Sequence, residues 1–213
     1  MTTFGTWSFA CPNCATNFES KVLKSTNSGG GVSTDFRQLS YDVGLLGALI
    51  HTCPNCGFSG FGNDLKNSVD QAVSERIAER ITPQIKAGKP SLADQFVNAG
   101  SIAEWMGGPA NSVATYYHYA AWCFADANDA ESERRYRALA AERFRGALSA
   151  NEMDAEDFMY TTYLVGELLR RASDSESAEW LSKAETLANE AGDERLAALA
   201  RQQRESPKDM IDS

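Results

Sequence analysis

Cys11-Pro12-Asn13-Cys14 and Cys53-Pro54-Asn55-Cys56 are two matched stretches separated by an insert of 38 residues. Each stretch offers two thiolates on one tight turn, and a tetrahedral Zn²⁺ ion needs four ligands. Proline after the first cysteine fixes the backbone of the turn, and Gly57 follows the second stretch at a position that tolerates a positive φ. The first stretch has Ala15 there instead. We therefore expect a zinc ribbon in which one metal ion is held by Cys11, Cys14, Cys53 and Cys56.

The ligand set favours structural zinc over three other kinds of site. Iron in a rubredoxin-like site uses the same four thiolates, but such sites have a shorter insert, so iron is the less favoured metal. A redox dithiol needs one Cys-x-x-Cys pair, preferably at a helix N-terminus, whereas both pairs here lie among turn and strand residues. A catalytic zinc keeps an open coordination position, and four cysteines leave none. His51 is a further candidate ligand, although an outward position on the strand that enters the second stretch is favoured.

The charge of the chain is unevenly distributed. The 213 residues carry a net charge of −9. Residues 1–62 hold three basic and three acidic groups, whereas residues 63–213 hold 17 basic and 26 acidic groups. Nucleic-acid binding draws most of its affinity from neutralised phosphates, so an acidic chain with no basic patch makes a nucleic-acid partner unfavourable. The same charge argues against binding to a membrane surface.

Neither a membrane span nor a signal peptide is expected from the sequence. The most apolar run, residues 43–50, is far too short to cross a bilayer. The first residues lack a basic region followed by an apolar core, so a cytoplasmic location is the default expectation. In that compartment the reducing conditions favour thiolates held by metal over structural disulfides.

A change of composition near residue 62 predicts two domains. Residues 1–62 are rich in Thr, Ser, Asn and Gly, with β-prone runs at residues 4–9 and 45–52. From Asn63 onward the chain is rich in Ala, Glu, Arg and Leu, which favour helices. The predicted fold class is mainly α, with a small β-rich zinc-ribbon domain over residues 1–62. A domain of tetratricopeptide-like helical hairpins follows over residues 63–213.

Hydrophobic periodicity and capping residues predict a succession of helices in the second half. Ser91 and Asp94 form a capping box, and Asp154 or a neighbour caps a later helix. Pro83 is expected to end or kink the first helix. The expected helices cover residues 69–81, 91–106, 112–127 and 130–149, then one that begins near residue 154, one that ends at Gly192, and one after it.

A weak internal repeat lies within these helices. The small, large and small residues of 140–147 (Ala, Phe and Ala) recur at 177–184 (Ser, Leu and Ala), 37 residues later. This spacing is typical of the second helix of a tetratricopeptide repeat, where small residues let helices approach and one large residue fills the gap. Gly166 and Leu169 would then belong to the first helix of the later unit.

The other residues that could act in catalysis or binding do not form a catalytic set. Cys123 lies in a strongly apolar helix and is expected to be a buried small residue, not a nucleophile. The four aromatic residues 116–119 could stack on bases, but helical geometry sends them in different directions, so core packing is favoured. With only His51 and His118 available, no Ser/His/Asp set can be argued. We predict that the protein is not an enzyme.

These motifs follow one known family pattern. It consists of an N-terminal Cys-Pro-x-Cys, a variable insert ending in a Tyr-containing segment, a Cys-Pro-x-Cys-Gly-aromatic segment with a Phe shortly after, and tetratricopeptide-like helices. The matching positions here are residues 11–14, 41–43 and 53–58 and Phe61. The chain resembles the prokaryotic domain-of-unknown-function family numbered 2225, and it departs from it in a longer apolar segment, residues 44–50. The resemblance implies zinc and a repeat-like helical body, and it brings no known activity.

The predicted role is protein–protein interaction, as a scaffold or adaptor. The helical hairpins would present a groove to another protein, and the ribbon would act as a metal-stapled cap or a second contact surface. The sequence leaves the partner's identity and the oligomeric state open. Two alternatives remain. A nucleic-acid-associated regulator would use the ribbon, which its neutral charge disfavours, and a metal- or redox-responsive sensor would need a labile site.

Overall fold

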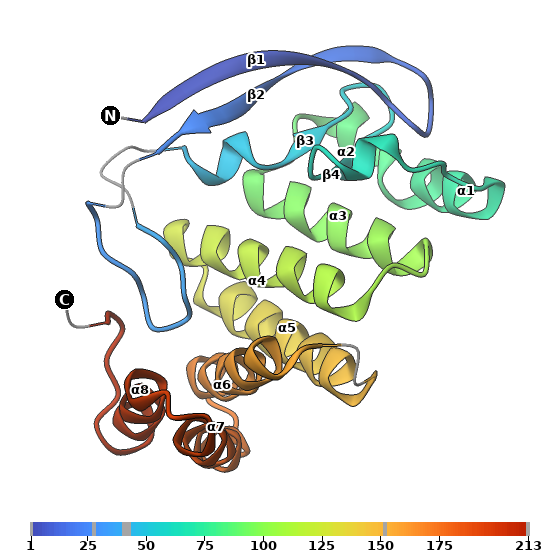
Figure 1. The fold of residues 1–213 in the computed structure, drawn as a ribbon. Helices are drawn as coiled ribbons and strands as arrows, with labels where there is room; N and C mark the ends of the chain where they lie inside the picture. The colour runs from blue at the N-terminus through green and yellow to red at the C-terminus, as the bar shows by residue number, and fades with distance from the viewer. Residues whose placement is uncertain (1, 27–28, 40–43, 151–152, 212–213) are drawn as a thin grey trace.

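A computed structural model describes residues 2–26, 29–39, 44–150 and 153–211 (Figure 1). The protein is mainly α-helical, with a small β-rich N-terminal part, as the sequence predicts. A β-hairpin lies over one end of a stack of helices, and the last helices of the chain lie at the opposite end (Figure 1). Within the described residues, none of the helices has the length and apolar character needed to cross a membrane.

The β-rich part consists of two antiparallel strand pairs. Strand β1 (Thr3–Ala10) pairs with β2 (Asn17–Ser25), and the short strand β3 (His51–Thr52) pairs with β4 (Ser59–Gly60). The strand predicted over residues 4–9 is therefore confirmed, whereas β2 was not predicted.

The second predicted β run, residues 45–52, is wrong for most of its length. A 3₁₀ helix, η1 (Leu46–Ala48), occupies its first half, and only β3 is extended. Leu46 and Leu49 both pack into one cluster with the helices. Residues three apart lie on one side of a 3₁₀ turn but on opposite faces of a strand, so the packing requires the turn.

From Asp64 to Glu205 most of the described chain is helical, and several helix limits follow the predicted caps. Ser91 and Asp94 make the predicted capping box, and Asp154 accepts a hydrogen bond from the N–H of Asp157. Gly192 ends its helix with a left-handed φ of 78°. In chain order the elements are η2 (Asp64–Lys66), α1 (Gln71–Arg80), α2 (Thr82–Ala87), α3 (Leu92–Trp105), α4 (Ala110–Asp126), α5 (Ala130–Ala150), α6 (Ala155–Arg171), α7 (Ser177–Ala191) and α8 (Glu194–Glu205).

Each helix from α3 to α7 packs on the next one along the chain (Figure 1). Small residues permit this approach. A Cβ atom added to Gly100 would lie 2.6 Å from Tyr117 Cε1, and one added to Gly166 would lie 2.8 Å from Leu181 Cγ. The second of these contacts joins Gly166 to Leu181, the large residue of the internal repeat. The assignment to tetratricopeptide repeats stays a prediction.

The β-rich part and the first helices share one hydrophobic core. Cysteines of both Cys-Pro-Asn-Cys turns and Phe58 belong to one hydrophobic cluster with residues of α1 and α3. The helical residues in this cluster are Val73, Ile77 and Ile102, together with Ile81 just after α1. Buried contacts therefore continue across residue 62, and the division into two domains stays a prediction.

Candidate metal centre

Four cysteine side chains converge between the two Cys-Pro-Asn-Cys turns. The Sγ atoms of Cys11, Cys14, Cys53 and Cys56 all lie within 4.8 Å of one another, and the described part of the chain holds no other group of three or more such side chains. Cys11 Sγ lies 3.5 Å from Cys56 Sγ, and Cys14 Sγ lies 3.6 Å from Cys53 Sγ. Four sulfurs bound to one tetrahedral zinc ion would lie about 3.8 Å apart. The donor set and its spacing therefore fit a single metal ion.

The two turns have the same backbone structure. In each turn the first cysteine donates its N–H to the carbonyl five residues later and accepts a hydrogen bond from the N–H four residues later, at 2.8 to 3.0 Å. The residue after each turn is left-handed, with a φ of 57° at Ala15 and 83° at Gly57. Alanine thus adopts the conformation that glycine supplies in the second turn, and the departure noted in the sequence does not alter the turn.

Hydrogen bonding and burial divide the four thiols into two kinds. The hydrogen bond with Cys56, together with burial, raises the pKa of Cys11 far above its usual value, and the same bond lowers the pKa of Cys56 to about 5. Burial raises the pKa of Cys53. Burial also opposes ionisation of Cys14, but hydrogen bonds with Thr16 and Asn55 lower its pKa. One cysteine of each pair is therefore held toward the thiolate form that a metal requires.

The asparagines of the two turns reach across the site. Asn55 Nδ2 lies 3.5 Å from Cys14 Sγ and donates to it. Asn13 in turn helps to lower the pKa of Cys56 through a hydrogen bond to its sulfur. Each asparagine supports a sulfur of the opposite pair, as outer residues that orient metal ligands do. The sequence showed the repeated asparagine, but its role depends on how the two turns face each other.

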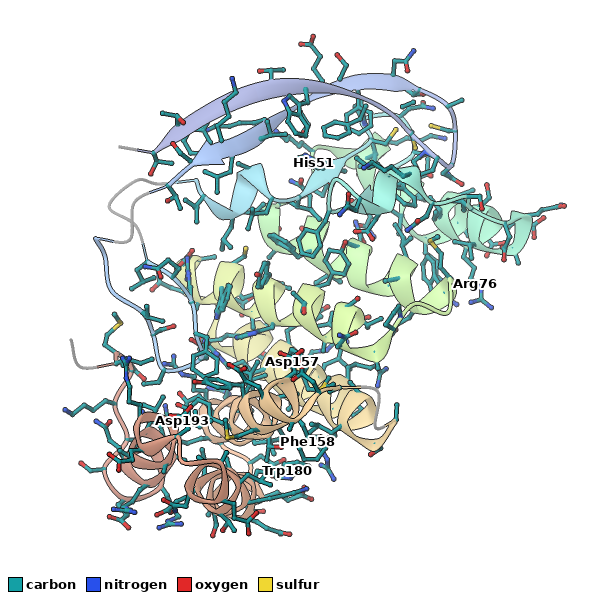
Figure 2. The ribbon with its side chains drawn as sticks, viewed as in Figure 1. His51, Arg76, Asp157, Phe158, Trp180 and Asp193 are labelled. Atoms are coloured by element: carbon teal, nitrogen blue, oxygen red, sulfur yellow. The ribbon has the colours of Figure 1, made fainter. Side chains whose placement is uncertain are left out.

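His51 does not join the cysteines. Its ring is 4% exposed, its Nδ1 lies 2.9 Å from Ser20 Oγ, and it stacks on Phe9 with ring centroids 4.5 Å apart. Burial lowers its pKa. The predicted outward position is therefore wrong, because the ring fills the space beneath the β1–β2 hairpin, where Figure 2 labels it.

The other residues singled out from the sequence are mostly part of the core. Tyr116, Tyr117 and His118 are buried, and Tyr119 is partly exposed, which confirms the predicted core packing with one exposed edge. Cys123 is also buried, as predicted, and burial raises the pKa of its thiol to about 12.

A buried polar cluster in the insert between the two turns escaped prediction. Asp35 is 1% exposed and accepts hydrogen bonds from Trp122 Nε1 at 2.8 Å and Arg137 Nη1 at 2.5 Å. His118 Nε2 lies 3.4 Å from the same carboxylate. One signal was present in the sequence, because Arg137 falls on the apolar stripe of α5 and a buried arginine needs a partner.

The neighbouring residue Thr34 fastens the same insert to α6 and to the C-terminal tail. Its hydroxyl donates to Glu167 Oε1 at 2.7 Å, and Glu167 is fully buried. Its N–H donates to the carbonyl of Asp209 at 3.0 Å, and its own carbonyl accepts from the Tyr163 hydroxyl at 2.9 Å. The insert segment, residues 29–39, is therefore bound to helices far along the chain.

Comparison with known proteins confirms the family that the sequence motifs resemble. A family described as "Uncharacterized protein conserved in bacteria (DUF2225)" matches residues 6–206, and the chain belongs to this family. No curated protein and no solved structure matches the chain. The Tyr-containing part of the family pattern, residues 41–43, lies outside the described residues.

Proposed function

We propose that this family member binds one structural Zn²⁺ ion and serves as a scaffold or adaptor for another protein, with no catalytic role. The observation that carries the zinc proposal is the group of four thiol sulfurs at tetrahedral spacing. Cys11, Cys14, Cys53 and Cys56 would hold the ion. Bound zinc would supply four metal–thiolate bonds and leave no open position for a substrate.

Burial of the site favours a structural ion over a labile sensor. Three of the four cysteines are 7% exposed or less, and Cys14 is partly exposed. The same cysteines belong to the core shared with α1 and α3. Release of the ion would therefore disturb packed residues, and zinc sites of this kind contribute on the order of 10 kcal/mol to folding.

The proposed absence of a catalytic role is supported by the burial of the two histidines and of Cys123, the side chains that could act in catalysis. His51 is buried and paired with Ser20, and His118 is buried beside Asp35. Cys123 is buried with a raised pKa, which disfavours its reactive thiolate.

The interaction role is supported by the arrangement and charge of the helices. Successive antiparallel helices with small residues at their contacts are typical of repeat proteins that present an extended surface. The acidic excess of the chain lies in residues 63–213. We expect the partner to present a basic surface, since complementary charge speeds association and selects partners.

Metal analysis tests the zinc proposal directly. The full chain, purified without added metal or chelator, is expected to contain one zinc per chain. Substitution with Co²⁺ should give the visible and charge-transfer absorption of a tetrahedral tetrathiolate site. Stoichiometric iron, or less than half an equivalent of any metal in folded protein, would contradict the proposal.

Co-purification from the native host tests the interaction role. A stoichiometric protein partner is expected, and it should dissociate at high salt because the expected attraction is between charges. A variant with three exposed helical carboxylates neutralised should retain less of it. These changes are Glu131→Gln, Glu179→Gln and Glu190→Gln, and retention unaffected by both salt and neutralisation would count against an acidic binding surface.

A further inference from the structure

Strand β1 is an edge strand with little protection against pairing. In the described residues it pairs with β2 alone. Its eight residues contain no charged side chain and no proline, and its one register shift lies at its first residue. Natural edge strands are usually protected by charge, proline or a cover. Trp7, on this strand, is 60% exposed and is the most exposed large hydrophobic residue described.

The Cys11 turn shows which backbone groups of β1 point to the free edge. Cys11 donates its N–H to the carbonyl of Thr16, so its backbone faces β2. Backbone groups alternate in direction along an antiparallel strand, so the odd-numbered residues of β1 face β2. Thr6, Ser8 and Ala10 therefore turn their N–H and C=O groups outward.

Space for an added strand lies beside this edge. A hollow of about 510 Å³ is lined by residues 7–10 of β1 and by residues around η2. Its apolar walls include Trp7, Phe9, Phe61 and Leu65. An incoming strand would find backbone partners on one side and apolar side chains on the other.

We propose that a second copy of this chain adds its own β1 to this edge, antiparallel, in a twofold dimer centred on Trp7. The outward residues then pair with each other, so that Thr6 lies opposite Ser8 of the second copy. Trp7 lies opposite its own counterpart in a non-hydrogen-bonded pair, where side chains are closest. Phe9 lies opposite Gly5, so a large residue meets the smallest one. The β1 sequence is thus complementary to itself in this register.

The charge distribution also favours a second copy as the occupant. Two chains of net charge −9 repel each other, but residues 1–62 carry equal numbers of basic and acidic groups. Strand β1 lies at the end of the molecule opposite α7 and α8, so this pairing keeps the acidic helices apart (Figure 1). The side chain that crosses Gly5 is the flexible Lys24, which can move aside for the second copy. A contact of this kind uses the same surface on both chains and closes as a dimer.

Charge substitutions at the twofold axis provide the test. Light scattering coupled to size exclusion, on the full zinc-loaded chain, is expected to give twice the mass of one chain. Trp7→Lys and Trp7→Glu should each give monomers, because two like charges would face each other, and an equimolar mixture should restore the dimer mass. Ser8→Pro should also give a monomer, since it removes an outward N–H and leaves the β1–β2 ladder intact.

The control is Tyr160→Lys, which adds the same charge at another exposed aromatic residue, remote from β1. It should remain a dimer, and zinc content and circular dichroism should show that all variants are folded. A wild-type chain that stays monomeric at its solubility limit overturns the proposal, and so does a dimer that survives Trp7→Lys. A third result would also overturn the proposal: a monomer that binds an unrelated extended peptide at the β1 edge and loses this binding in Ser8→Pro. The edge would then serve a different protein.

Discussion

Asp35 Oδ2 lies 2.5 Å from Arg137 Nη1, and the two side chains are 1% and 2% exposed although 102 residues separate them. The carboxylate belongs to the insert segment between the two Cys-Pro-Asn-Cys turns, and the guanidinium belongs to α5. Burying either charge without the other would cost several kcal/mol. The insert segment is therefore most stable where Asp35 meets Arg137 on α5. The pair therefore helps to fix where the insert segment packs on the helices.

Removing the charge of Asp35 tests this role. Asp35→Asn keeps the shape of the side chain but leaves Arg137 without its buried carboxylate. We expect the free energy of unfolding of the zinc-loaded chain to fall by about 3–5 kcal/mol in urea. The control, Asp126→Asn, breaks the exposed ion pair with Arg37 and should cost about 1 kcal/mol or less. Equal losses of unfolding free energy in the two variants would show that the buried pair stabilises the fold no more than the exposed one.

His118 should make stability depend on pH. Burial lowers its pKa, which the nearby Asp35 opposes and Arg137 and Arg171 reinforce. The unfolded imidazole binds a proton near pH 6.5 while the folded one resists it, so this contribution is complete above about pH 6.5 and is lost as the pH falls. Stability should therefore decline from pH 7 to pH 5, and less steeply in His118→Gln.

Urea unfolding at several pH values measures the two slopes. Acid would also protonate the proposed zinc ligands, but this would affect both proteins alike, so the difference between the two slopes comes from residue 118. The carboxyl of Asp35 adds a separate loss at lower pH. Its burial opposes ionisation, but the hydrogen bond with His118 and the charges of Arg171 and Arg137 hold its pKa well below the usual range. Its contribution therefore fades below about pH 4. Parallel slopes for wild type and His118→Gln between pH 7 and pH 5 would show that His118 does not cause this loss of stability.

Glycine is required after the second turn but not after the first. At Gly57 an added Cβ would lie 2.6 Å from Ile81 Cγ2, and φ is 83°. We expect Gly57→Ala to lower the free energy of unfolding by about 1–3 kcal/mol, through backbone strain and this contact. Ala15 already adopts a φ of 57°, so Ala15→Gly should change stability by about 1 kcal/mol or less. Thermal unfolding of both zinc-loaded variants measures the two stability losses. A larger loss in Ala15→Gly than in Gly57→Ala would refute the argument.

Local sequence signals account for what could be predicted. Each Cys-Pro-Asn-Cys turn depends on residues within six positions of one another, so the sequence was enough to predict both turns. The matching of the two turns indicated that the four cysteines would lie together, as they do. Helix limits likewise followed from nearby caps such as Ser91, Asp154 and Gly192. The internal repeat indicated that small residues would let these helices approach, but the contact of Gly166 with Leu181 is seen only in the structure.

The insert segment could not be predicted because its partners are distant in sequence. Asp35 and Thr34 look like solvent-exposed loop residues, and nothing near them indicates burial. Their partners lie on α4, α5, α6 and the C-terminal tail, which meet only in the folded chain. The 3₁₀ helix η1 was not predicted for the same reason. Leu46 and Leu49 pack on helices that are distant in sequence, and this packing determines their conformation.

Single cysteine substitutions separate metal ligands from other thiols. Cys53→Ser removes one of the four sulfurs at the fully buried corner of the site, so bound zinc should fall well below one equivalent. Cys123→Ser is the matched control, because that thiol is also buried but lies in α4, away from the cluster. It should keep one equivalent of zinc by elemental analysis. Equal zinc loss in both variants would contradict the ligand assignment.

Chelation should loosen the protein unevenly, because the proposed metal ion and the Asp35 cluster would hold different parts of it. Removal of zinc takes away the link between the two turns, so hydrogen exchange should speed up in β1 to β4 and in α1, which shares their core. The insert segment should stay protected, since Thr34 and Asp35 are fastened to α4, α5 and α6 by bonds that do not involve the cysteines. In Asp35→Asn the same treatment should expose the insert segment as well. Exchange that spreads through the insert segment of the wild-type chain on chelation would mean that the metal, and not the buried ion pair, holds it in place.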